Sequence, residues 1–182
     1  MKVESTKFKD CFILRPQVFT DQRGYFFESF NQIDFEEKTG LKVNFVQDNQ
    51  SYSQRGTLRG LHFQKGAAQQ AKLVRVIQGE ILDVIVDLRR DSPTYGQHLT
   101  LLLDDVEHKQ LFIPKGFAHG FLVLSKTAVF AYKCDNYYAK ETESGIRYND
   151  PALAIQWPSL EQDYIIAEKD LVLPQFNALD PL

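Results

Sequence analysis

Short apolar runs separated by turn signals recur along most of the 182-residue chain, a pattern typical of all-β proteins. We expect strands at residues 43–46, 72–77, 81–88, 99–103, 111–113, 121–124 and 128–133. Residues 81–88 alternate most clearly: the even-numbered positions are apolar, and the odd-numbered face combines Ile81 and Ile85 with Asp83 and Asp87. The turn at residues 78–80 makes this strand one arm of a hairpin.

Helical patterns are few. Residues 30–38 form the best early candidate, ended by Gly40, and the chain beyond Ser159 is expected to add another helical turn. No repeat, low-complexity segment or linker divides the sequence, so we expect a single domain over residues 1–182. Many short strands in one unit favour a sandwich, jelly roll or barrel whose interior holds a small ligand.

Composition and charge argue against several kinds of partner and location for the protein. The formal net charge of -3 supplies no global basic field, which argues against nucleic acid. Residues 1–11 carry charges and no apolar core of a signal peptide, and no membrane span is expected. Cys11 and Cys134 are far apart and suit buried positions in a reducing cytoplasm.

Gly-rich dinucleotide or phosphate loops and nucleophile elbows are missing, so the chemistry must come from other residues. Of the four histidines, His62 and His119 lie in turn-flanked segments, Arg-Gly-Leu-His and Lys-Gly-Phe-Ala-His-Gly. His98 and His108 lie among residues that we expect to be solvated.

His62 is a candidate metal ligand, because small β-barrels often bind a metal through two histidines of one strand that are separated by a single residue. Here the second position is Gln64, so we predict no metal site. His62 is then available for proton transfer near neutral pH, with a half-buried structural histidine as the alternative.

Seven segments stand out along the chain. They are Asp-Gln-Arg-Gly-Tyr-Phe-Phe-Glu (21–28), Phe-Val-Gln-Asp-Asn (45–49), Leu-Arg-Gly-Leu-His-Phe (58–63), Lys-Leu-Val-Arg-Val (72–76), Pro-Lys-Gly-Phe-Ala-His-Gly (114–120), Tyr-Lys (132–133) and Gly-Ile-Arg-Tyr-Asn-Asp-Pro (145–151). In this order they resemble the dTDP-4-dehydrorhamnose 3,5-epimerase family, and the resemblance runs from about Asp21 to Asp170. It implies a cupin-type jelly-roll β-barrel with a few short helices, a homodimer and no cofactor.

The resemblance also implies catalytic roles. His62 corresponds to the base, Asp170 to the carboxylate that orients it, and Tyr132 to the general acid. Lys72 corresponds to the cation that holds an enolate oxygen, and His119 lies near the sugar. Without the resemblance, these residues would be interpreted as a barrel-lining aromatic, surface charges and a turn cap.

Further positions correspond to contacts with the dTDP-sugar substrate. Arg23 and Arg59 match diphosphate contacts, Tyr138 matches a residue that stacks on thymine, and Glu28, Gln47, Asp48, Asn49, Glu143 and Lys169 match other binding positions. Individually, each would suggest a surface ion pair or turn cap. Two loops depart from the family pattern: Lys140 stands where many members have Pro, and residues 66–70 replace a shorter or Pro-containing segment. We expect both changes to affect how the nucleotide fits.

The resemblance therefore implies an isomerase that inverts C3 and C5 of dTDP-4-dehydro-6-deoxy-D-glucose, giving dTDP-4-dehydro-L-rhamnose for dTDP-rhamnose synthesis, and we expect it in the cytoplasm. An epimerase acting at C3 or C5 alone is the alternative enzyme. A jelly roll that binds a nucleotide sugar without catalysis is the alternative from another class.

Overall fold

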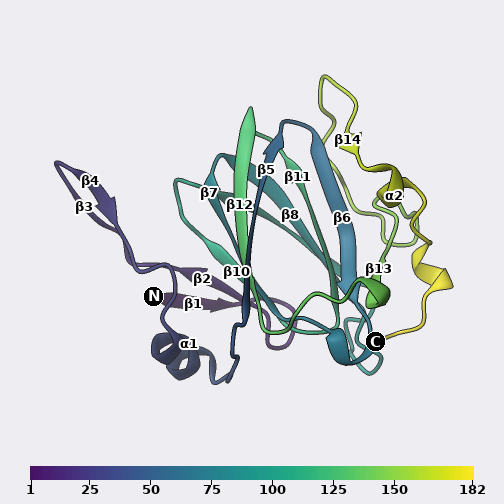
Figure 1. The fold of residues 1–182 in the computed structure, drawn as a ribbon, viewed down its shortest axis with the longest axis horizontal. Coiled ribbons are helices and arrows are strands. Elements are labelled where there is room, and N and C mark those ends of the chain that lie inside the picture. The colour runs from purple at the N-terminus through teal and green to yellow at the C-terminus, as the bar shows by residue number, and fades with distance from the viewer.

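The computed structural model describes residues 1–182 as two six-stranded sheets that face each other, with a separate hairpin at one side (Figure 1). The first sheet has the order β1 (Lys2–Ser5), β2 (Phe12–Arg15), β10 (Gln110–Ile113), β7 (Lys72–Gln78), β12 (Thr127–Cys134) and β5 (Gln47–Gln54). The second has the order β13 (Glu143–Gly145), β6 (Thr57–Gln64), β11 (Phe117–Val123), β8 (Glu80–Asp87) and β9 (His98–Asp104), with β14 (Ile165–Ile166) parallel to β6. The all-β jelly-roll prediction is confirmed.

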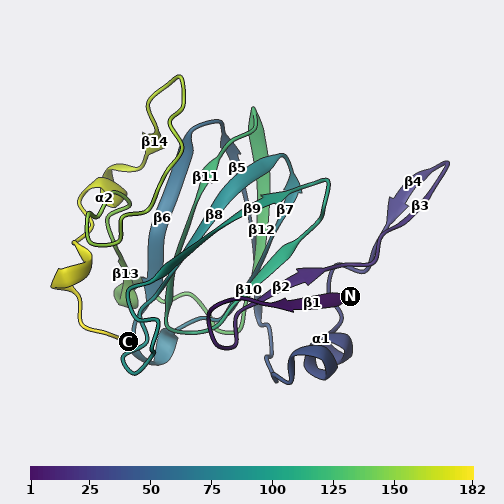
Figure 2. The same ribbon diagram turned by 180° about the vertical axis from the view of Figure 1, so that it is seen from behind.

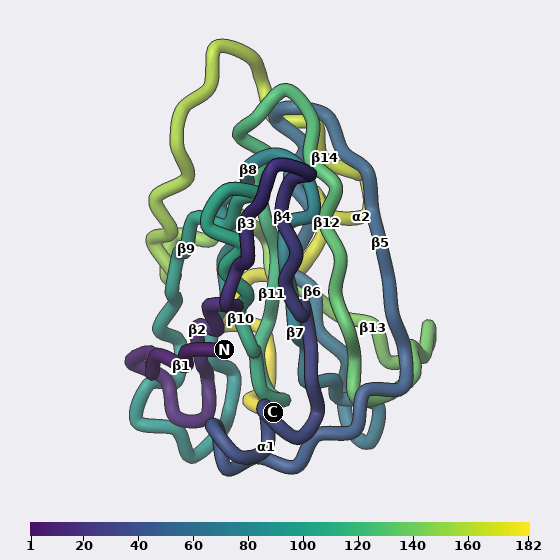
Figure 3. Tube along the Cα trace, turned by 90° about the vertical axis from the view of Figure 1, so that its left-hand side faces the viewer, coloured from purple at the N-terminus to yellow at the C-terminus, as the bar shows by residue number.

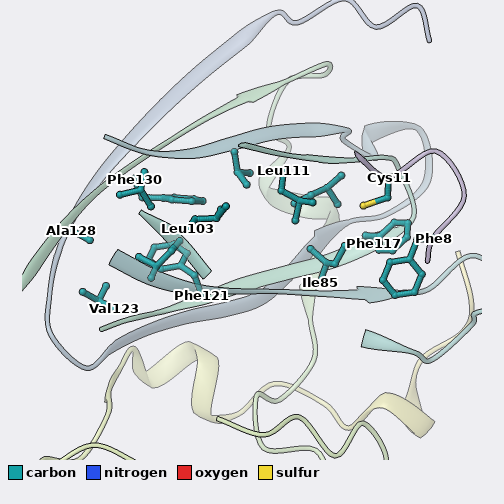
Figure 4. Packing of buried hydrophobic residues seen from close by; sticks show 14 residues of the cluster. Phe8, Cys11, Ile85, Leu103, Leu111, Phe117, Phe121, Val123, Ala128 and Phe130 are labelled. Atoms are coloured by element: carbon teal, nitrogen blue, oxygen red, sulfur yellow. The ribbon is translucent and has the colours of Figure 1, made fainter. Parts of the chain in front are cut away.

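The main core lies between the two sheets. Ile81 and Ile85 of β8 belong to this core together with residues such as Phe121 and Phe130. Figure 4 labels Ile85, Phe121 and Phe130 among its side chains. On the other face of the same strand, Val84 and Val86 pack in a second cluster against the C-terminal segment. Figure 2 shows this segment running outside β6. The alternation predicted for residues 81–88 therefore separates two apolar layers.

The helix predicted near residue 30 is confirmed as α1 (Gln32–Thr39). The Asn31 side chain accepts hydrogen bonds from two backbone N–H groups of the first turn, and Gly40 ends the helix with φ 72°. The later helical turn is also present, as α2 (Glu168–Leu171). No helix has the length and apolar character of a membrane span.

The strand predicted at residues 43–46 is wrong. This segment connects α1 to β5 without strand pairing. The Val43 carbonyl accepts a hydrogen bond from the Gln32 side chain, and Val43 and Phe45 pack around the buried Phe35 of the helix. The apolar run therefore serves helix packing and not a sheet.

Strands β3 (Phe19–Asp21) and β4 (Gly24–Phe26) form a hairpin that extends away from both sheets in Figure 1, and Figure 3 shows it in front of them. Two of its apolar side chains, Phe19 and Phe26, are 55% and 70% exposed. Near the base of the hairpin, His108 packs against the rings of Tyr25 and Phe27 and is only 8% exposed. The expectation that His108 is solvated was therefore wrong, because aromatic side chains far away in sequence cover it.

Candidate active site

A cavity of about 480 Å³ lies between the sheets. Seven of the residues singled out from the sequence line it: Arg59, His62, Lys72, His119, Tyr132, Lys169 and Asp170. Its other lining residues are Ser51, Thr57, Leu58, Gly120, Phe121, Phe130, Ile165, Ile166 and Ala167. Polar side chains of both sheets thus converge on one partly apolar space.

His62 and Asp170 form a hydrogen-bonded pair in this cavity. His62 Nε2 lies 2.7 Å from Asp170 Oδ1, and the aspartate is 2% exposed. Burial acts to raise the pKa of Asp170, but hydrogen bonds from His62 and the Gly60 backbone outweigh it, so this pKa lies below its ordinary value. Asp170 is therefore a carboxylate suited to orient the ring and to stabilise an imidazolium.

The segment Arg59-Gly60-Leu61-His62 positions the ring through its glycine. Gly60 has φ 115°, and a Cβ atom at this position would lie 2.6 Å from the Gly120 Cα of β11. The Gly60 N–H donates to Asp170 Oδ2 at 3.3 Å. Only glycine allows this close approach of β6 and β11 next to the histidine.

Tyr132 and Lys72 line the cavity from neighbouring strands of the other sheet. The Lys72 ammonium lies 5.8 Å from the centre of the Tyr132 ring and forms no ion pair with a carboxylate. Burial lowers the pKa of Lys72, and burial raises the pKa of Tyr132. The cavity thus contains a protonated phenol and a lysine without a carboxylate partner, whose ammonium form can donate to a negative oxygen.

Asp83 is a site residue that the sequence did not reveal. Its Oδ1 lies 2.7 Å from His119 Nε2, and both side chains are buried. The available signal was an aspartate between Ile81 and Ile85 on the apolar face of a strand. That signal marks a buried charge, but it does not identify the partner.

The residues matched to nucleotide binding form a connected group near the cavity. The Tyr138 hydroxyl donates to Glu143, which also pairs with Lys169 of the cavity wall at 3.1 Å. Gln47 accepts the backbone N–H of Tyr138 and donates to Asn49. Arg59 is held by the hydroxyl of Ser53, to which its Nε donates at 3.1 Å.

Three further matched residues neither line the cavity nor join the group around Tyr138. Asp48 pairs with Lys133 at 2.7 Å, and neither residue lines the cavity. Arg23 lies at the tip of the projecting hairpin, pairs with Asp21, and has a side chain that is 86% exposed. Glu28 lies between the hairpin and α1, and it does not line the cavity.

The two loop departures lie below the Tyr138 segment. Gln70 donates to the backbone carbonyl of Asn136, and the Asn136 amide donates to the carbonyl of Ala67. Lys140 begins a short 3₁₀ turn that leads into β13. The segment at residues 66–70 therefore holds the backbone two residues before Tyr138, and neither departure lines the cavity.

Gln64, the residue at the position of a second metal-binding histidine, has a structural role. Its Oε1 accepts hydrogen bonds from the Ala139 backbone and the Thr142 hydroxyl, and the residue does not line the cavity. The structure has no group of three or more His, Cys, Asp or Glu side chains arranged to hold a metal. Cys11 and Cys134 are buried and free, as predicted.

Comparisons with known proteins extend over nearly the whole chain. A family model described as dTDP-4-dehydrorhamnose 3,5-epimerase matches residues 5–178. The dTDP-4-dehydrorhamnose 3,5-epimerase of Salmonella typhimurium is 51% identical over 174 residues, covering 96% of this chain and 94% of that protein. The crystal structure of the dTDP-6-deoxy-D-glucose-3,5-epimerase of Legionella pneumophila in complex with dTDP-4-keto-L-rhamnose is similar, with a TM-score of 0.94, 46% identity, and coverage of 98% of this chain and 94% of that one. A 3'-monoepimerase from Streptomyces bikiniensis in complex with dTDP-quinovose is also similar, with a TM-score of 0.87, 29% identity, and coverage of 93% and 85%.

Proposed function

The chain belongs to the dTDP-4-dehydrorhamnose 3,5-epimerase family, and we propose that it inverts C3 and C5 of dTDP-4-dehydro-6-deoxy-D-glucose to give dTDP-4-dehydro-L-rhamnose. The observation that carries this proposal is one cavity lined by a histidine of one sheet, paired with the Asp170 carboxylate of α2, and by a phenol of the other sheet. Inversion of a carbon needs a proton removed from one face and returned to the opposite face.

His62 acts as the base in this proposal. With Nε2 held by Asp170, its Nδ1 is the nitrogen that takes the proton next to the C4 ketone of the substrate. Asp170 stabilises the resulting imidazolium without itself taking the proton. The electron pair of the broken C–H bond moves into an enolate, whose oxygen becomes negative.

Lys72 and Tyr132 complete the cycle. The unpaired Lys72 ammonium stabilises the enolate oxygen. Tyr132 keeps its proton at neutral pH, because burial raises the pKa of this phenol, and it delivers that proton to the opposite face of the carbon. After each inversion His62 gives its proton to water and the Tyr132 phenolate takes one from water. The same steps can then invert C3 and C5 in turn, and no cofactor is used.

The nucleotide end of the substrate is assigned to the group around Tyr138. Tyr138 stacks on thymine, Arg59 contacts the diphosphate, and Gln47, Asn49, Glu143 and Lys169 bind the remaining polar groups. The exposed Tyr138 ring and its hydrogen bond to Glu143 support a role at the mouth of the cavity.

A homodimer accounts for the residues outside the cavity. We infer that the hairpin around Arg23 crosses to a second copy, as the resemblance to the family implies, and brings Arg23 and Glu28 to the partner's cavity. Its exposed apolar residues, such as Phe26, support this exchange. Sedimentation should detect a dimer, and a stable, active monomer would contradict it. A single domain in the cytoplasm, with two free cysteines, completes the proposal.

The decisive experiment incubates the protein with dTDP-4-dehydro-6-deoxyglucose in heavy water and follows the sugar by NMR. Deuterium at both C3 and C5 with conversion to the L-rhamno product supports the proposal. Deuterium and inversion at one centre would indicate the single-centre alternative. The similarity to a 3'-monoepimerase is the observation that favours this alternative. Binding without exchange indicates the non-catalytic alternative.

A further inference from the structure

Asp83 and His119 form a second imidazole–carboxylate pair beside the cavity. The pair joins β8 to its neighbour β11, whereas the first pair joins β6 to the C-terminal α2. In both pairs, Nε2 faces the carboxylate, so Nδ1 is the nitrogen left for other contacts. The base assignment uses only one of these rings.

Asp83 has an unusual environment for a carboxylate. The residue has no exposed surface, and its Oδ2 is the one buried side-chain nitrogen or oxygen of the structure without a hydrogen-bond partner. A buried polar atom left unpaired costs about 1–3 kcal/mol, and more when the group is charged. Its neighbours on the same face of β8, Ile81 and Ile85, belong to the apolar core, so an apolar side chain would suit position 83 for packing alone. The position therefore calls for a role beyond packing.

The charge of Asp83 acts on Lys72. Burial lowers the pKa of Lys72, while Cys134, Asp83 and Glu143 act to raise it. The other titratable or charged groups that share the cavity with Lys72 are Tyr132 of β12, His119 of β11, Arg59 and His62 of β6, and Lys169 and Asp170 of the C-terminal segment. Among the acids that raise this pKa, Asp83 alone is held by a histidine of the cavity wall.

We propose that Asp83 is a positioning residue for epimerisation, which fixes the His119 ring with Nδ1 toward the sugar and places a buried negative charge behind the cavity wall that His119 shares with Lys72. The inference rests on the proposed function, because it concerns the same cavity. During enolate formation the proton passes from carbon to His62, and Asp83 neither gains nor loses one. Its contribution is a fixed dipole and charge that need no rearrangement when the enolate forms.

The test compares Asp83→Asn with Asp87→Asn, a matched control. Asp87 lies on the same face of β8 and is equally buried, but it bonds to Arg89, Ser92 and Thr94 outside the cavity. We expect Asp83→Asn to lower kcat about 10- to 100-fold, as the loss of a carboxylate that orients a histidine does elsewhere. Asp87→Asn should lower Tm and leave kcat of the folded protein unchanged.

The pH profile separates positioning from a structural role. Removing the Asp83 charge takes away a contribution that raises the Lys72 pKa, so the ammonium is lost at lower pH. The alkaline limb of kcat/KM should therefore move to lower pH in Asp83→Asn and stay in place in Asp87→Asn. Wild-type kcat together with an unmoved limb in Asp83→Asn would overturn the inference.

A measurement on the wild-type protein keeps the inference testable if the variant fails to fold. Nitrogen-15 NMR of the histidine rings should find the His119 Nε2 carrying a hydrogen-bonded proton. An Nε2 without a proton would show that Asp83 does not hold the ring in this way. Failure of the proposed function has a different signature, because the wild-type protein would then incorporate no deuterium into the sugar.

Discussion

Asp170 Oδ1 lies 2.7 Å from His62 Nε2, although 108 positions separate the two residues in the chain. The aspartate belongs to a helix of a single turn near the C-terminus, and the histidine belongs to a central strand of the second sheet. Folding of the last part of the chain is therefore needed before the proposed base has its partner. This link couples the stability of the C-terminal segment to the catalytic cavity.

The pair predicts a pH-dependent loss of stability in Asp170→Asn. At pH 7 the variant should lose about 1–3 kcal/mol in the free energy of unfolding. The pKa of Asp170 in the folded protein lies below its ordinary value of 3.8, so its stabilising effect is present above that value and is lost as the pH falls through the folded pKa. Urea unfolding should thus show the difference from wild type narrowing in strong acid.

Asp180→Asn is the matched control for this prediction. Asp180 is an exposed aspartate of the C-terminal segment without a side-chain hydrogen bond or ion pair. Its variant should unfold like wild type at every pH. A difference between wild type and Asp170→Asn that stays constant across the acid range would contradict the explanation.

The conformation of Gly60 leads to a prediction about stability, which can be measured without an activity assay. In Gly60→Ala, the added Cβ would meet Gly120 Cα at 2.6 Å, and the residue would have to hold φ 115°. We expect about 2–4 kcal/mol of destabilisation from strain and displacement of β11. Gly66→Ala, at φ 57° with nothing within 4 Å, should cost only about 1 kcal/mol. Equal losses in urea unfolding would refute the close-approach argument.

Much of this structure could be predicted because neighbouring residues encode it. The alternation in residues 81–88 set the two faces of β8, and Gly40 marked the end of α1. Residues 43–46 show the limit, because an apolar run does not say whether it will pair as a strand or pack on a helix. Here the contacts with Phe35 of α1, which lies outside the run, favour packing on the helix.

The site shows the same division. Phe130 and Tyr132 lie two positions apart in the strand predicted at residues 128–133, so alternation places them on one face, and both line the cavity. The partnership of His119 with Asp83 depends on the pairing of β8 with β11, which no local pattern reports. Burial of His108 likewise depends on rings from the hairpin, more than 80 positions away.

Metal independence is expected for the reaction. The proposed steps use only side chains, and Gln64 is engaged with Ala139 and Thr142 at the position where a second histidine would be needed. Prolonged treatment with a chelator should leave kcat unchanged, and elemental analysis should find less than one metal ion per chain. Activity that disappears on chelation and returns with one particular metal would contradict this.

His62→Ala should abolish both deuterium uptake and epimerisation, because no enolate forms at a useful rate without the base. General-base catalysis contributes about 10²- to 10⁴-fold, so both rates should fall by at least that order. His98→Ala is a suitable control, since His98 lies on β9 and does not line the cavity. Deuterium uptake that persists at the wild-type rate in His62→Ala would assign the base elsewhere.

Tyr132→Phe separates the two proton transfers. The substitution keeps the ring that packs against Phe130 and removes only the hydroxyl, so the fold of the cavity should be retained. His62 can still take a proton from carbon and return one to the same face, which exchanges deuterium without inversion. Deuterium uptake should therefore outlast product formation, as NMR in heavy water can measure for both in one sample. A tyrosine that only filled the barrel would leave epimerisation nearly unchanged on losing its hydroxyl, so a wild-type epimerisation rate in Tyr132→Phe would refute the acid role.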